Sequence, residues 1–216
     1  MILCVDPGLS MGSGGTGWAV FNDDSLIPER TGVIRSGKGT WQQRAENICI
    51  TMEHMLNYSE ICDVRMLAAA YIELPTFFQN EKGLTCATGK DGDDSDLVKL
   101  SYLVGRIAGM FYMWQVPVTT VRINGAGGWK GTGMGKMVVA HRIADRLGLK
   151  AEGRQDDPKL VRVKGGEAVI SSHAIDAVGI GLHIKGVFKA NAKLPQERPG
   201  SGIARASYRR RFKGRN

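Results

Sequence analysis

An acidic residue closes the first apolar run of the chain, and this pairing constrains the fold more than any other local feature. Residues 1–5 are apolar, Asp6-Pro7-Gly8 follows, and a second β-like run covers 16–21. A carboxylate at the end of a buried strand is costly to desolvate unless positive charge lies against it. Pro7 lacks an N–H and Gly8 permits a tight turn, so the chain reverses just beyond the acid. Alone, this pattern favours a polar strand end before a hairpin.

Three residues far apart in the sequence change that interpretation. Glu73 ends another β-like run, and His173 and Asp176 lie three residues apart in a helix-like segment. That spacing places His173 and Asp176 on one helix face. Carboxylates together with a histidine have the ligand chemistry of a Mg²⁺ or Mn²⁺ site. Each residue alone is usually structural, but Asp6, Glu73, His173 and Asp176 in this order and context favour a metal site.

The apolar periodicity predicts an α/β fold. Strands are expected at about 1–6, 16–22, 30–35, 66–73 and 117–123. Helices are expected from Gly39-Thr40 onward, at 95–114, at 135–148, and around His173, where Ser171 or Ser172 offers an N-cap oxygen. A three-strand meander followed by alternating helices and strands implies a mixed five-stranded sheet with helices on both faces. On the second helix, Gly105, Ala108 and Gly109 would permit close packing of another helix or subunit.

The motif order resembles that of the RuvC-type Holliday junction resolvases, which belong to the RNase H-like nuclease superfamily. The shared pattern is strand-Asp6-Pro7-Gly8, a Thr-Gly-Trp-Ala strand at 16–19, strand-Glu73, and His173-x-x-Asp176 on a C-terminal helix. The resemblance covers about 1–184, and longer segments at 9–15, 83–96 and 150–170 indicate a divergent branch, for which a phage or mobile element is the expected source. It implies an α/β RNase H-like fold.

The resemblance also implies a mechanism and a site. A Mg²⁺- or Mn²⁺-dependent endodeoxyribonuclease is expected, with two ions per active site held by Asp6, Glu73, His173 and Asp176. Asp6 would bridge the ions, Glu73 would bind one and Asp176 the other. His173 would complete a metal shell or assist the leaving group. Because the family cuts four-way DNA junctions symmetrically as homodimers, branched DNA and a second copy of the chain are the expected partners.

Several residues outside the metal site are expected to contact DNA. In the Gly/Lys-rich segment 129–136, Lys136 is the better match to a phosphate-binding lysine of the family and Lys130 the weaker one. Phe77 or Phe78, just beyond Glu73, would stack on an exposed base, while the other packs under the loop.

The C-terminal segment 185–216 is strongly basic. It has ten Lys and Arg and one acid, whereas the whole chain has a net charge of +8, so the rest is nearly neutral. Its Arg209, Arg210 and Arg211 are expected to belong to a flexible arm that binds DNA phosphates, with a solubilising tail as the alternative. We therefore divide the chain into a nuclease domain, 1–184, and a basic tail, 185–216.

The remaining composition bears on location. No stretch is long and apolar enough to span a bilayer, and the apolar start of the chain is not expected to be a signal peptide because Asp6 interrupts it. The four cysteines have neither metal-finger nor disulfide-framework spacing, which favours reduced thiols. A cytoplasmic protein of a bacterium or a phage-infected host, without membrane contact, is expected.

Three alternatives to a junction resolvase remain open. The strongest is a nuclease of the same superfamily that acts on another branched DNA, an R-loop or RNA, because fold does not determine substrate. An actin-like ATPase or sugar kinase also begins with Asp-x-Gly after a strand, but it needs a second such loop; no nucleotide cofactor is therefore expected. A binding module without catalysis is disfavoured because all four site positions carry ligand-competent side chains.

Overall fold

A central sheet of five strands organises the molecule. The structure is a computed structural model that describes residues 1–9, 15–75, 78–80, 83–85, 96–123, 128–130, 135–163 and 168–188. The strand order is β3-β2-β1-β4-β7. The first three strands pair antiparallel, and β4 and β7 continue the sheet in parallel with β1. The strands are β1 (Ile2–Asp6), β2 (Gly15–Phe21), β3 (Arg30–Arg35), β4 (Ala69–Leu74) and β7 (Val118–Arg122).

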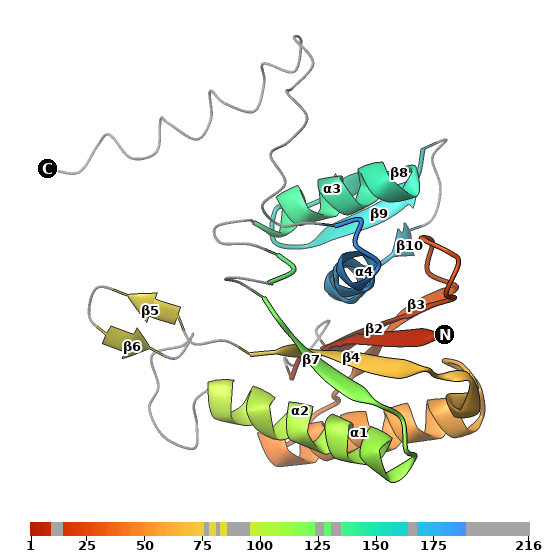
Figure 1. Cartoon of the computed structure of the whole chain (residues 1–216). Coiled ribbons are helices and arrows are strands. Elements are labelled where there is room, and N and C mark those ends of the chain that lie inside the picture. The colour runs from red at the N-terminus through yellow and green to blue at the C-terminus, as the bar shows by residue number, and fades with distance from the viewer. Residues whose placement is uncertain are drawn as a thin grey trace, which may run out of the picture.

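Helices cover both faces of this sheet. Figure 1 shows α1 (Trp41–Asn57) and α2 (Asp96–Met113) on one face and α4 (Ser172–Ile184) on the other. The helix α3 (Lys136–Leu147) lies beyond α4. The predicted RNase H-like fold class, with its mixed five-stranded sheet and helices on both faces, is confirmed by this topology.

Alternation along β1 builds two cores. Leu3 and Val5 belong to the core that contains the buried residues of α1 and α2, whereas Cys4 belongs to the core formed with α4. Successive strand residues point to opposite faces, so a strand covered on both sides is apolar throughout, as 2–5 are. The polar Asp6 therefore lies where β1 leaves both cores.

Local signals set the start of α1. Thr40 is its N-cap, and Thr40 and Gln43 form a reciprocal capping box: the Thr40 hydroxyl accepts from the Gln43 N–H and the Gln43 side chain accepts from the Thr40 N–H. The predicted helix start at Gly39-Thr40 is thus confirmed.

Three parts of the chain differ from the prediction. The sequence pattern places the start of the fourth strand at 66–68, but Val64–Met66 form a short 3-10 helix capped by Asp63, and β4 begins at Ala69. A second, antiparallel sheet is not predicted; it contains β8 (Leu149–Gly153), β9 (Pro158–Arg162) and β10 (Ala168–Ile170). A separate hairpin, β5 (Phe78–Asn80) and β6 (Gly83–Thr85), is not predicted either.

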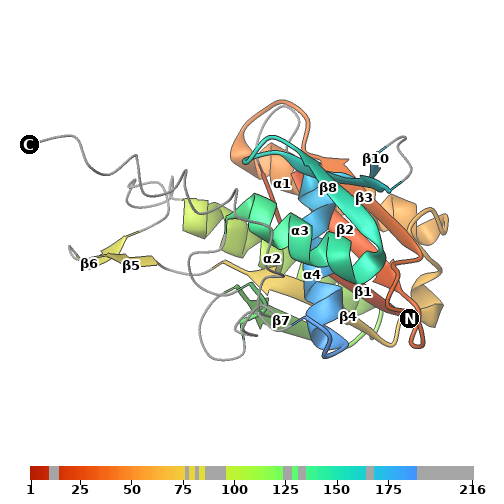
Figure 2. The same ribbon diagram turned by 90° about the horizontal axis from the view of Figure 1, so that it is seen from above.

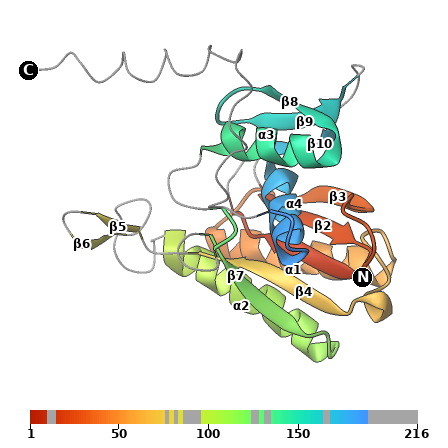
Figure 3. The same ribbon diagram turned by 45° about the horizontal axis from the view of Figure 1, so that its top comes forward.

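The second sheet and α3 form an additional layer above α4. Figures 2 and 3 show α3 and the β8–β10 strands stacked on the side of α4 that faces away from the central sheet. Buried residues of this layer, including Ile143 and Leu160, share one core with α4. As a result α4 is enclosed on both sides, which explains why nine of its residues are buried (Ser172, Ala174, Ile175, Ala177, Val178, Gly179, Ile180, Gly181 and Leu182).

Two compositional predictions concern the described residues. Cys4, Cys49 and Cys62 are free and buried, as expected of reduced thiols, and Cys86 lies outside the described residues. No helix in the described part of the chain is long and apolar enough to cross a membrane.

Candidate functional site

The structure brings three of the predicted acids to one edge of the central sheet. Asp6 ends β1 and Glu73 lies near the end of β4. These strands are parallel neighbours with Val5 opposite Ile72, so the next residues, Asp6 and Glu73, lie side by side. Asp176 comes from the second turn of α4, which lies across β1 and β2 (Figure 3).

A glycine on β2 allows α4 to approach this closely. Gly17 pairs with Asp6 in the β1–β2 ladder, and a Cβ atom at Gly17 would overlap the backbone carbonyl of His173. The first turn of α4 therefore rests directly on the β2 backbone. The Thr-Gly-Trp-Ala strand thus has a physical role in the site: its glycine sets the distance between the helix and the sheet.

The pKa values of the Asp6 and Glu73 carboxyls are raised by burial and by neighbouring carboxyls. Desolvation raises the pKa of Asp6 well above its usual range, and the charges of Glu73 and Asp176 raise it further. Desolvation and then Asp176 raise the pKa of Glu73 to about 7. All three residues are half-buried, and the side chain of Asp176 is 15% exposed.

A Trp-Lys pair engages two of the acids. Lys130 Nζ lies 3.1 Å from Asp176 Oδ2 and 3.3 Å from Oδ1. The indole Nε1 of Trp129 donates a hydrogen bond of 2.7 Å to Glu73 Oε2. Of the two lysines proposed from the sequence, Lys130 is therefore the one that lies in the acid cluster. The sequence pattern does not single out Trp129 as functional, and its position beside Lys130 is the only local signal.

His173 lies on the first turn of α4, half-buried, between charges of both signs. Burial lowers the pKa of His173, and the positive charge of Lys136 lowers it further, while Asp157 and Asp176 act in the opposite direction. A lowered pKa favours the neutral imidazole, the form that binds a metal or accepts a proton. Lys136 is exposed at the start of α3. Its charge acts on His173, and among the described residues it forms no ion pair with the three acids of the cluster.

The start of α4 differs from the capping prediction. Ser171 is the N-cap residue, but its side chain makes no capping hydrogen bond. Ser172 instead donates a 2.6 Å hydrogen bond from Oγ to Asp157 Oδ1, in the connection between β8 and β9. This bond ties the second sheet to the helix turn that carries His173, a link that no local pattern in the sequence indicates.

The chemistry of the cluster suits a divalent cation, although the side chains do not yet form a ligand shell. Three carboxyls face one ammonium group, so the ionised cluster has excess negative charge, and Mg²⁺ prefers carboxylate oxygens. Within the described ranges, no group of three or more His, Cys, Asp and Glu side chains is arranged to hold a metal ion. Lys130 and Trp129 bond carboxylate oxygens of Asp176 and Glu73, the same atoms that would coordinate a metal ion.

Several predicted DNA contacts fall outside what the structure describes. Phe77 lies outside the described residues, and for Phe78, the first residue of β5, only the backbone is described. Arg209, Arg210 and Arg211 also lie outside them. These assignments stay predictions.

Comparison with known proteins yields structural neighbours only. No protein-family model and no curated protein sequence matches the chain. The structure of Thermus thermophilus RuvC is similar at 17% identity and a TM-score of 0.49, covering 87% of this chain and 98% of RuvC. T. thermophilus RuvC in complex with a Holliday junction substrate is similar at 18% identity and a TM-score of 0.46, covering 87% and 97%. YeaZ from Pseudomonas aeruginosa follows at 12% identity and a TM-score of 0.33, covering 79% of this chain and 67% of YeaZ. RuvC, whose motifs the sequence resembles, is thus among the solved structures similar to this chain.

Proposed function

We propose that this chain is a divalent-metal-dependent endonuclease that hydrolyses phosphodiester bonds in four-way DNA junctions. The observation that carries the nuclease chemistry is the cluster of Asp6, Glu73 and Asp176 at one sheet edge, with Lys130 beside it. The choice of four-way junctions as substrate rests on the resemblance of the motif order to that of the RuvC-type resolvases. Another branched DNA, an R-loop or RNA is the alternative substrate.

In this proposal the three acids hold Mg²⁺ or Mn²⁺, in up to two sites. The bound metal would supply Lewis-acid activation of a water molecule and neutralise charge in the transition state. The charges of both Glu73 and Asp176 raise the pKa of Asp6, so Asp6 interacts with both of the other acids, which supports its assignment as the shared ligand. His173, with its lowered pKa, is suited to bind as a neutral ligand or to accept a proton.

Lys130 has a second part in this proposal. Its ammonium group now compensates Asp176 at 3.1 Å. With a cation held by Asp176, Lys130 would be free to pair with a non-bridging oxygen of the DNA phosphate, because an ammonium group suits either anion. Lys136, exposed at the start of α3, would contact the DNA backbone further from the reacting bond.

The decisive experiment compares substrates and metals. Purified protein is incubated with a synthetic four-way junction, a linear duplex of the same sequence, another branched DNA, an R-loop or RNA, in Mg²⁺, Mn²⁺, Ca²⁺ or EDTA. Paired nicks in the junction are expected with Mg²⁺ or Mn²⁺, whereas Ca²⁺ should support binding without cutting because it tolerates loose coordination geometry. Absence of cutting of any branched DNA, R-loop or RNA with either metal would reject the nuclease, and ATP hydrolysis would favour the ATPase alternative.

A homodimer is part of the proposal and is supported by the outer face of α2. A Cβ atom added to Gly105 or Gly109 would meet nothing within 4 Å, so these glycines do not serve close packing among the described residues. Tyr112 and Met113, at the end of the same helix, are 79% and 78% exposed. An exposed apolar helix face with small residues is typical of a protein contact. A second copy is the proposed occupant.

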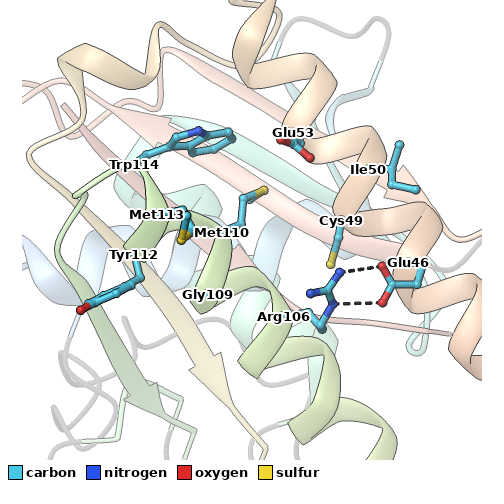
Figure 4. Close-up of a pocket in the computed structure, with 10 residues that line it drawn as sticks. All are labelled: Glu46, Cys49, Ile50, Glu53, Arg106, Gly109, Met110, Tyr112, Met113 and Trp114. Carbon is cyan, nitrogen blue, oxygen red and sulfur yellow. Dashed lines mark hydrogen bonds and ion pairs between the residues drawn. The ribbon is translucent and has the colours of Figure 1, made fainter.

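The neighbouring groove extends this face. Figure 4 shows Met110, Met113 and Trp114 on the α2 side and Ile50 on α1, with the Glu46–Arg106 ion pair of 2.8 Å joining the two helices. Sedimentation velocity should give a dimer for the wild type and a monomer for Met113→Glu, with the exposed Lys38→Gln as a surface control. A monomeric wild type at micromolar concentration would reject the dimer.

The basic tail is proposed as a DNA-binding arm. Its first residues pack on the domain: Lys185 Nζ donates to the backbone carbonyls of Asn22 and Asp23, and Phe188 is 4% exposed. A tail attached at this point would supply phosphate contacts near the domain without taking part in the chemistry, whose proposed ligands all lie within 6–176.

A further inference from the structure

Trp129 combines complete burial with a polar contact to a proposed metal ligand. Its side chain is 0% exposed, and its Nε1 lies 2.7 Å from Glu73 Oε2. An indole N–H can only donate, so this bond singles out one carboxylate oxygen of Glu73 and restricts rotation of the carboxylate.

The Trp129 ring is held by two other elements. A Cβ atom at Gly179 of α4 would overlap the ring, so the absence of a side chain there is what lets the indole lie against the helix. The Trp129 N–H donates to the Arg122 carbonyl at the end of β7 over 3.0 Å. Trp129 therefore contacts three elements. Its ring packs on α4, the helix that carries Asp176; its backbone N–H bonds the end of β7; and its indole N–H bonds Glu73 on β4.

Lys130, the next residue, makes a corresponding pair of contacts, one to the backbone near β7 and one to Asp176. Lys130 donates from its backbone N–H to the Ile123 carbonyl over 3.0 Å and pairs through Nζ with Asp176. Two adjacent residues thus engage two acids that come from different elements. The lysine can be released by a competing cation, whereas the indole bond to one oxygen leaves the other oxygen of Glu73 available.

We propose that Trp129 is a positioning residue that fixes the Glu73 carboxylate for metal binding; this inference rests on the proposed metal-dependent function. Groups that hydrogen-bond a metal-ligating side chain without contacting the metal commonly contribute about 10–100-fold to metal affinity or activity. Trp129 would act through Glu73 and would not itself touch the metal or the DNA.

The test compares the removal of two indole N–H groups. Trp129→Phe keeps an aromatic ring and removes the donor. Trp18→Phe is the matched control, because Trp18 is 5% exposed and its Nε1 has no hydrogen-bond partner among the described residues. Mn²⁺ binding is measured by electron paramagnetic resonance without DNA, and thermal unfolding in EDTA verifies that each variant folds.

Trp129→Phe is expected to weaken Mn²⁺ binding about 10–100-fold and to lower turnover by a similar factor, with junction affinity in Ca²⁺ unchanged. Trp18→Phe should leave Mn²⁺ affinity unchanged. In the Glu73→Gln background, Trp129→Phe should produce no additional loss of Mn²⁺ affinity, because residues that act through one another are not additive in a double-mutant cycle. A purely structural tryptophan would give additive losses.

Three outcomes would overturn the inference: wild-type Mn²⁺ affinity in Trp129→Phe, an equal loss in Trp18→Phe, or additivity with Glu73→Gln. The proposed function fails separately. If the wild type binds Mn²⁺ but cuts no nucleic acid, the nuclease is rejected, while the Mn²⁺ measurements still decide the role of Trp129. A wild type that binds no Mn²⁺ rejects both.

Discussion

At the scale of single residues, the site is built from groups whose charges are unfavourable together. Asp6 is flanked by Glu73 and Asp176, and both raise its pKa in addition to desolvation. Lys130 lies on Asp176 and only partly offsets this charge. Such an arrangement destabilises the metal-free protein, and the same excess of negative charge is what would bind a divalent cation.

Replacing Asp6 separates these two effects. Asp6→Asn should reduce cleavage to the level measured in EDTA, because a neutral amide is a poor bridging ligand, yet it should leave junction binding largely intact since phosphate contacts dominate affinity. In EDTA the variant should be more stable than the wild type by about 0.5–2 kcal/mol, because burying the Asp6 carboxyl beside two other acids costs free energy whether it is charged or takes up a proton, and the amide avoids this cost. Single-turnover cleavage and denaturant unfolding provide the measurements. Near-wild-type turnover in Mg²⁺ would exclude Asp6 as a ligand.

Glu73 gives a prediction about pH. Its pKa is raised from 4.5 to about 7 in the folded protein, so the folded protein binds a proton on Glu73 more tightly than the unfolded chain does. The stability that this protonation contributes is fully present below pH 4.5 and is lost as the pH rises through about 7. Glu73→Gln has no such proton to lose. In EDTA, the melting temperature of the variant relative to the wild type should therefore increase between about pH 5 and about pH 8. Glu53→Gln, at an exposed acid of α1, is the control for the Glu-to-Gln exchange itself. A pH-independent difference for Glu73→Gln would contradict the assignment.

At the scale of elements, the site depends on the packing of α4 between two sheets. On one side its first turn rests on β2 at Gly17, and on the other Ser172 bonds Asp157 of the second sheet's connection. Both contacts fall within the turns that carry His173 and Asp176. The distance between these residues and the β1–β4 edge is therefore set by packing on both sides of the helix.

Gly17→Ala tests this packing. The added methyl would overlap the His173 carbonyl, so the helix must shift away from β2. A cost of about 1–3 kcal/mol in the free energy of unfolding is expected for such overpacking, together with a loss of Mn²⁺ affinity as Asp176 moves from Asp6 and Glu73. Gly135→Ala is the control, because a Cβ there would meet nothing within 4 Å. Wild-type stability and Mn²⁺ affinity in Gly17→Ala would show that the helix start is not held in this way.

At the scale of the whole molecule, the nearly neutral domain is expected to carry out the cleavage, and the basic tail is expected to contribute to the affinity for DNA. Removal of 189–216 leaves Lys185 and Phe188, which pack on the domain, in place. The deletion should weaken junction and duplex binding by similar factors, because phosphate contacts carry no base information. The log–log salt slope should become shallower by about 0.9 for each DNA phosphate that the tail neutralises in the full-length protein.

Single-turnover cleavage at saturating concentrations of the truncated protein should change little. An unchanged salt slope would instead identify the tail as a solubilising segment. Loss of junction binding with duplex binding preserved would mean that the tail responds to branch geometry.

Local rules in the sequence are sufficient to predict the five strands of the central sheet, the four helices and the acids at their ends. These rules are the apolar run of β1, the capping box at Thr40 and the three-residue spacing of His173 and Asp176. The second sheet escapes prediction because its strands are short and cover α4 only through tertiary packing.

The groups that contact the acids follow from tertiary packing and from no local rule. Trp129 and Glu73 are 56 residues apart, and Lys130 and Asp176 are 46 apart, so no periodicity links either pair. The sequence motif favours Lys136 as the functional lysine, yet Lys130 is the one that reaches the acid cluster, because backbone bonds at the end of β7 direct it there. A local pattern can supply ligand-competent residues at element ends; which donors meet them depends on how β4, β7 and α4 pack.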